Sequence, residues 1–212
     1  MRRNTLELLA VFLGACCLML PLCSRAGELL NVYRPTAQLP PSVRRVAVLP
    51  VTVDTRDLAA DEGRDALEPV LYTELQKHAA ADLVEITREQ LRDLTGRKEW
   101  TTADTLPPDF FERLRAATGC DAVVFSRLTR FRAYPPLGVG WNLQLVDTQK
   151  RSLWAVDEVF DAGNPAVAAA ARRYYVHCLR TPGFCDSSTV LFSPRRFGQF
   201  AASQASATMP GR

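Results

Sequence analysis

The sequence is poor in the residues and motifs on which enzymes usually depend. It has only two histidines, His78 and His177, and both fall near the ends of predicted helices, where an imidazole stabilises the negative end of the helix dipole. No P-loop and no Gly-x-Ser-x-Gly elbow occurs. The acidic residues of the loop 54–65 lack the spacing of a calcium-binding loop. We therefore predict no catalytic centre, no metal site and no cofactor.

A strong excess of charge of either sign is also missing. The formal net charge is +3, and the first 22 residues contribute two arginines and one glutamate to it. The remaining chain is therefore close to +2, and its basic pairs are scattered. Proteins that bind nucleic acid usually carry a concentrated basic surface, so we do not expect nucleic acid as a partner.

One uncharged run stands out, at residues 8–22, after Arg2 and Arg3. It is shorter than the roughly 20 apolar residues of a membrane-spanning helix, and it is typical of a secretory leader. Small residues before Cys16 resemble the processing site of a bacterial lipoprotein, whose cysteine receives a diacylglyceryl group. Cys23 is the alternative lipidation site. An ordinary cleaved leader and a retained anchor helix also remain open.

The other three cysteines lie farther along the chain. Cys178 and Cys185 flank a short segment that contains Pro-Gly, a turn signal. In an oxidising compartment these two thiols are expected to form a disulfide. A zinc site that includes His177 is the alternative, but it lacks a fourth ligand. Cys120 precedes an apolar segment and is expected to be a small buried residue.

The hydrophobic pattern predicts a single domain of the α/β class with a mixed sheet, a βα-βαα-βββ order and C-terminal helices, in two or three layers. Strands are expected at 43–53, 83–87, 120–134, 139–145 and 153–160, and helices around 67–75, at 88–95, from 107 to 118, from 165 to about 179 and from 194. Pro69 is expected in the first turn of its helix. Early alternation predicts parallel pairing, and the late meander predicts antiparallel pairing. The predicted organisation is a leader at 1–22, a flexible tether at 23–42 and the domain at 43–208, with a frayed tail after residue 208.

Three short segments support a family resemblance. They are Arg45-Val-Ala-Val-Leu-Pro, Val84-Glu-Ile-Thr and Gly119-Cys-Asp-Ala-Val-Val. In this order and spacing, residues 43–161 resemble the α/β domain of envelope lipoproteins of the curli-secretion type. They are also similar to the N-terminal domain of the Tol-Pal protein TolB and to lipoprotein activators of peptidoglycan synthases. The resemblance implies a binding, scaffolding or export role rather than an enzyme. The export channels use long hairpins, whereas the loops predicted here at 134–139 and 147–151 are short.

Arginines and aromatic residues gather near the end of the strand at 120–134, and such residues often anchor protein interfaces. The predicted partner-binding residues are Arg130, Arg132, Phe131, Tyr134 and Trp141. The alternative is that Phe131 and Trp141 fill the core. The predicted function is a lipid-anchored, non-catalytic binding or scaffold protein of the periplasm, attached to the outer membrane, with an unknown envelope protein or a second copy as partner. The alternatives are an oligomeric export component and an enzyme of unrecognised type.

Overall fold

The computed structural model describes residues 31–53, 58–178 and 187–211. The strands in this part are β1 (Val32–Tyr33), β2 (Arg45–Val48), β3 (Thr52–Val53), β4 (Asp82–Glu85), β5 (Ala122–Arg132), β6 (Gly138–Asp147) and β7 (Ser152–Asp161). The helices are α2 (Leu58–His78), α3 (Arg88–Thr95), α4 (Phe110–Thr118), α5 (Pro165–Cys178) and α6 (Pro194–Ser206), with a short 3-10 turn at Ser187–Leu191. Among these residues, no helix is both long and apolar enough to span a membrane.

The strands form one mixed sheet, in the order β1-β7-β6-β5-β2-β4, with β3 paired to β5. β2 pairs in parallel with β4 and β5, whereas β5, β6 and β7 form an antiparallel meander. This arrangement confirms the predicted α/β class. The strand predicted at 43–53 is divided, because the chain leaves β2 near Pro50 and pairs again farther along β5 as β3.

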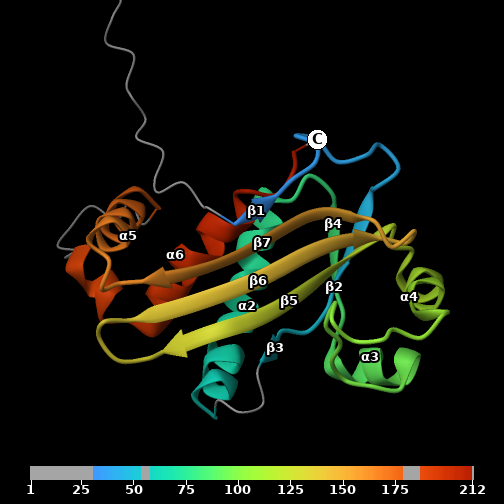
Figure 1. Cartoon of the computed structure of the whole chain (residues 1–212), viewed down its shortest axis with the longest axis horizontal. Helices are drawn as coiled ribbons and strands as arrows, with labels where there is room; N and C mark the ends of the chain where they lie inside the picture. Colours follow the sequence, from blue (N-terminus) through green and yellow to red (C-terminus); the bar gives the residue numbers. More distant parts are fainter. Residues whose placement is uncertain (1–30, 54–57, 179–186, 212) are drawn as a thin grey trace, which may run out of the picture.

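Helices cover the two faces of the sheet unequally (Figure 1). The first face carries α2, α5 and α6, and its core includes Trp141, Trp154 and Phe197. The second face carries α3 and α4 beside the parallel strands, with Phe110 and Phe125 in a separate core. The parallel end of the sheet therefore has three layers. The antiparallel end has two, because α5 and α6 pack on β6 and β7 from the first face.

Local end signals place most of the helices as the sequence predicts. The Thr87 hydroxyl accepts a hydrogen bond from the Gln90 amide, and the Gln90 side chain accepts one from the Thr87 amide, which completes a capping box. Gly96 and Gly119 end α3 and α4 with φ angles of 84° and 71°, a left-handed conformation that glycine adopts readily. Ser193 caps α6, whose first residue is a proline.

The predicted start of α2 near Pro69 is wrong, because the helix already begins at Leu58 and Pro69 lies inside it. A proline in a helix leaves one carbonyl group without its amide donor, here that of Asp65. Both Pro69 and Asp65 lie on the exposed side of α2, where water can bind that carbonyl. The first half of α2 is stabilised by packing, since a Cβ added at Gly63 would lie only 2.4 Å from Cγ of Phe131.

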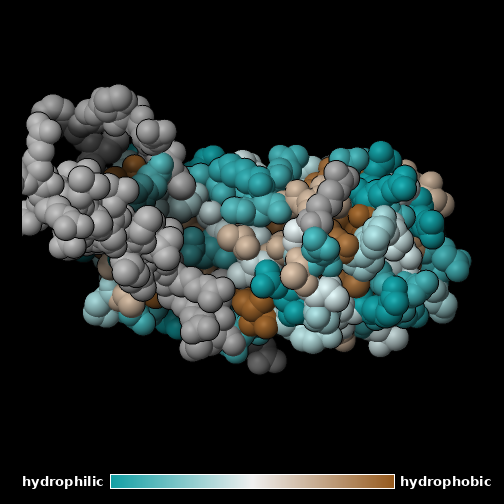
Figure 2. All heavy atoms as spheres, turned by 90° about the horizontal axis from the view of Figure 1, so that it is seen from above, coloured by the Kyte–Doolittle hydropathy of each residue, from teal (hydrophilic) through white to brown (hydrophobic). Residues whose placement is uncertain are grey.

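Two other expectations are wrong for the described residues. The segment from residue 31 is not a tether, because Val32 and Tyr33 pair with β7 and Leu39 is buried. The tail is not frayed up to Gly211, whose carbonyl oxygen accepts a hydrogen bond of 2.8 Å from the Leu39 amide. Met209 is buried beside this contact. The first 30 residues, with both candidate lipidation cysteines, lie outside the described part. Figure 2, which views the molecule from the side of β1, shows mainly hydrophilic residues with small, separate hydrophobic areas.

Candidate functional site

The end of the β5–β6 hairpin gathers three of the five predicted partner-binding residues. Arg132 donates a hydrogen bond to the Pro136 carbonyl oxygen and a second one, of 2.8 Å, to Oδ1 of Asp161 on β7. Arg130 approaches the other oxygen of Asp161 at 4.0 Å. One carboxylate from the neighbouring strand thus holds two guanidinium groups on the same side of the hairpin. Because two arginines face one carboxylate, the end of the hairpin carries an excess of positive charge.

Tyr134 is the most exposed large hydrophobic side chain in the described part of the chain, with 81% of its surface accessible. It lies in the short link between β5 and β6, next to the cis peptide bond between Pro135 and Pro136. Leu137, at the other end of the link, is fully buried and attaches the link to the core. We call Arg130, Arg132, Tyr134, Pro136 and Asp161 the hairpin-end surface.

Trp141 does not belong to this surface. It is 0% exposed and lies in the core between the sheet and α2 and α6, opposite Leu128 of β5. The proposed contact of Trp141 with a partner is therefore corrected. Phe131 is half-buried, and its ring packs on Gly63 of α2. Both aromatic side chains fill the core, which is the alternative that the sequence left open.

A groove on the second face of the sheet was not predicted from the sequence. Two adjoining hollows of about 370 and 260 Å³ lie between the loop at 101–106 and the antiparallel strands. They share Thr102, Phe125 and Gln144. The polar side chains of the second hollow include Thr129, Asn142 and Asp157. In the described part of the chain, no third layer covers β6 and β7, and this leaves the groove open.

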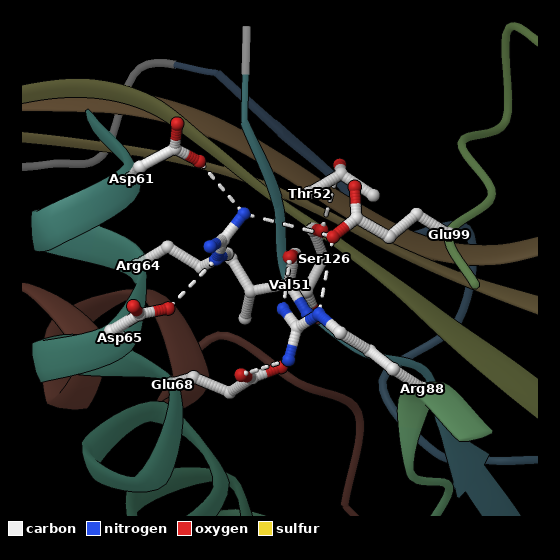
Figure 3. A network of polar contacts seen from close by, with 9 residues as sticks. All are labelled: Val51, Thr52, Asp61, Arg64, Asp65, Glu68, Arg88, Glu99 and Ser126. Carbon is white, nitrogen blue, oxygen red and sulfur yellow. Dashed lines mark hydrogen bonds and ion pairs between the residues drawn. The ribbon is translucent and has the colours of Figure 1, made fainter. Parts of the chain in front are cut away.

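A network of charged groups lies beside Thr52 and Ser126, two residues that line the second hollow (Figure 3). Arg88, the first residue of α3, pairs with Glu68 of α2 at 2.7 Å and with Glu99 at 3.1 Å, and it donates to the Val51 carbonyl oxygen at 3.0 Å. Glu68 accepts a hydrogen bond of 2.7 Å from the Val51 amide. Arg64 of α2 lies 3.7 Å from Glu99. The network joins α2, α3 and the link between β2 and β3.

The charged groups of this network pair with one another. Burial alone would lower the pKa of Arg88, but its hydrogen bonds and ion pairs with Glu68 and Glu99 outweigh burial and raise that pKa above the usual value. Both carboxylates are also paired. The network therefore supports the fold and offers no free group for a ligand. Sequence spacing gave no signal for it, because its members are far apart in the chain.

The residues that could support catalysis are dispersed or inaccessible. Cys120 is buried as predicted, and burial raises the pKa of its thiol, which opposes formation of a nucleophilic thiolate. His78 and His177 lie in the last turns of α2 and α5. Within residues 31–53, 58–178 and 187–211, no group of three or more histidine, cysteine or acidic residues is placed to bind a metal. Cys185 and the side chain of Cys178 lie outside the described residues, so their disulfide stays a prediction.

Comparison with known proteins assigns no family. No family model matches the chain, and no curated protein matches it in sequence. Among solved structures, it is similar to a PelC dodecamer from Paraburkholderia phytofirmans, with 13% identity over 86% of this chain and 96% of that chain and a TM-score of 0.47. It is also similar to lipoprotein GNA1162 from Neisseria meningitidis, with 15% identity, coverage of 66% and 99% and a TM-score of 0.40. A third similarity is to the LpoB C-terminal domain from Escherichia coli, with 16% identity, coverage of 55% and 81% and a TM-score of 0.34.

Proposed function

We propose that this chain is a lipid-anchored, non-catalytic protein of the bacterial envelope that binds another envelope protein through its hairpin-end surface. The observation that carries the proposal is the exposure of Tyr134 beside Arg130 and Arg132. Tyrosine and arginine are frequent anchors of protein interfaces. Arg132 is already held by Pro136 and Asp161. Its side chain therefore loses little further conformational entropy when a partner binds.

The anchor is proposed at Cys16, with Cys23 as the alternative, and the protein is placed in the periplasm at the outer membrane. The distance between anchor and domain is limited by the chain. The fold begins by residue 32, where β1 pairs with β7. A fully extended chain spans at most about 29 Å from Cys23 to Asn31 and about 54 Å from Cys16. A partner of the hairpin-end surface would therefore meet the domain close to the bilayer.

The anchor can be tested by labelling cells with radioactive palmitate. The unaltered chain should incorporate the label, and one of the two variants Cys16→Ala and Cys23→Ala should lose it. The other variant serves as the control for expression and export. Absence of label from the unaltered chain would exclude lipidation at either site.

The surface can be tested by photocrosslinking in intact cells. A photoreactive amino acid at position 134 should give a discrete crosslinked product, whereas the same probe at Glu112, exposed on α4, should not. Arg132→Ala in the background of the position 134 probe should weaken the product. A product that contains only this chain would instead identify a self-associating protein. Equal crosslinking from positions 134 and 112 would refute the proposed surface.

A further inference from the structure

A second surface lies at the opposite end of the sheet, along β4 (Figure 1). β4 is the last strand in the sheet order, and β2 is its only strand partner in the described part of the chain. The amides of Asp82 and Ile86 donate to β2, at 2.9 Å to the Arg44 carbonyl oxygen and at 3.0 Å to that of Val48. Main-chain groups of alternate residues point to opposite sides of a strand. The main-chain groups of Leu83 and Glu85 therefore point away from the sheet.

These outward groups are mostly unpaired. The Tyr72 hydroxyl donates a long hydrogen bond of 3.4 Å to the Leu83 carbonyl oxygen. The described residues offer no hydrogen-bond partner to the Leu83 amide, the Glu85 amide or the Glu85 carbonyl oxygen. An open edge with free donors and acceptors can pair with another extended chain.

Side chains on both faces of β4 form additional surface that an added strand could contact. On the second face of the sheet, a groove of about 490 Å³ runs beside the strand, between α3 and the end of α4. Val84 and Leu94 supply apolar surface there, and Asp93 lies among its lining residues. On the first face, Tyr72 and Leu83 are half-buried beside the same edge. An added strand would place alternate side chains in the groove and over Tyr72.

Acidic groups determine which added strand fits. Glu85 is exposed and has no ion pair within the described residues. Asp93 is 72% exposed, and its near cation is the adjacent Arg92 at 3.6 Å. The guanidinium of Arg45, the basic residue of this groove, donates to the Thr118 carbonyl oxygen at 3.2 Å. Carboxylates are thus available on both faces of the edge.

We propose that β4 accepts an extended segment of another polypeptide that carries basic side chains, by addition of a strand to the sheet. The Leu83 and Glu85 main-chain groups supply the hydrogen bonds, and Glu85 and Asp93 supply the preference for lysine or arginine. The strand has four residues, so we expect a weak and reversible interaction. This surface is distinct from the hairpin-end surface and does not depend on the function proposed for it.

The test uses the full chain in detergent and a blocked peptide of alternating lysine and valine. Hydrogen exchange with residue resolution is measured at the Leu83 and Glu85 amides. At about 80% occupancy by the peptide, exchange at both amides should slow about fivefold. The same peptide N-methylated at every residue should not protect them, because its methyl groups block close approach of the strand and it cannot donate to the Leu83 and Glu85 carbonyl oxygens. A peptide with glutamate in place of lysine should bind more weakly.

A charge reversal tests the acidic preference. Glu85→Lys should weaken binding of the lysine peptide by about three- to tenfold, whereas Glu62→Lys, an equal change at an exposed site on α2, should leave it unchanged. The proposal is overturned if no saturable binding occurs, if the N-methylated peptide binds equally well, or if both charge reversals act alike. Protection of these amides that rises with protein concentration and needs no peptide would show that a second copy occupies the edge, and would also overturn it.

Discussion

Replacement of Gly198 by alanine gives a sharp test of the packing between α2 and α6. Gly198 lies inside α6, and a Cβ added there would be 2.3 Å from Cδ2 and 2.9 Å from Cδ1 of Leu67 on α2. Leu67 is 0% exposed, so its side chain cannot move out into solvent. One of the two helices must therefore move, or Leu67 must adopt a strained rotamer.

The expected change in stability is a balance of two terms. Alanine in place of glycine favours a helix by about 1 kcal/mol. Overpacking of a core costs about 1–3 kcal/mol and sometimes more, and the short contact with Leu67 favours the upper part of that range. We expect Gly198→Ala to lower the free energy of unfolding by about 1–2 kcal/mol. For a domain of this size, the melting temperature should fall by roughly 2–8 °C.

Urea unfolding of the full chain in detergent, followed by far-ultraviolet circular dichroism, measures this change. Gly211→Ala is the control, because a Cβ there has no atom within 4 Å. The double variant Gly198→Ala, Leu67→Ala should lose less stability than the sum of its single variants by at least about 1 kcal/mol, since the smaller side chain removes the clash. A stabilised Gly198→Ala variant, or strict additivity in the cycle, would refute the packing described for α2 and α6.

Three further predictions concern polar groups. Glu74 is 1% exposed and accepts a hydrogen bond of 2.9 Å from Gln199. In urea unfolding, Glu74→Ala should lower the free energy of unfolding by about 1–3 kcal/mol, and Glu74→Gln should lower it less. Equal losses of stability in the two variants would contradict this role. Arg88→Met should cost about 2–3 kcal/mol in urea unfolding because two carboxylates lose their partner. A loss below about 0.5 kcal/mol would contradict the pairing. Hydrogen bonds from Thr101 lower the pKa of Asp104, so its contribution is present above the unfolded pKa and is lost as the pH falls through the lower folded pKa. Asp104→Asn should therefore be less stable than the unaltered chain by roughly 0.5–1.5 kcal/mol at pH 7. Unfolding curves at pH 3 should show a smaller difference in stability. A larger difference at pH 3 would contradict the stabilising role of the Asp104 carboxylate.

Signals that act within a few residues were read correctly from the sequence. The Thr87 capping box and the glycines after α3 and α4 depend only on neighbours along the chain, so their effect does not require the rest of the fold. The alternation of Val139, Trp141 and Leu143 also predicted a strand with one buried face. The order of strands and helices was sufficient for the mixed sheet.

Long-range packing explains the errors. Nothing near Pro69 indicates that α2 extends to Leu58, because contacts such as that of Gly63 with Phe131 on β5 support its first half. In the same way, the pairing of β1 with β7 and the bond between Leu39 and Gly211 join segments that are distant in the chain. Short segments with weak patterns become ordered only when such partners are present.

The same difference between local pattern and long-range packing applies to the candidate surfaces. Residue order along the chain was enough to predict that arginines and aromatic residues gather at the end of β5, and that alternate residues of β5 and β6 share a face. The packing of α2 and α6 on one face of the sheet, which could not be predicted from the chain, buries Trp141 and leaves Tyr134 exposed. Only the structure placed β4 at an open edge beside a groove. Periodicity fixes the direction of a side chain relative to its own strand, whereas its burial depends on which distant element packs there.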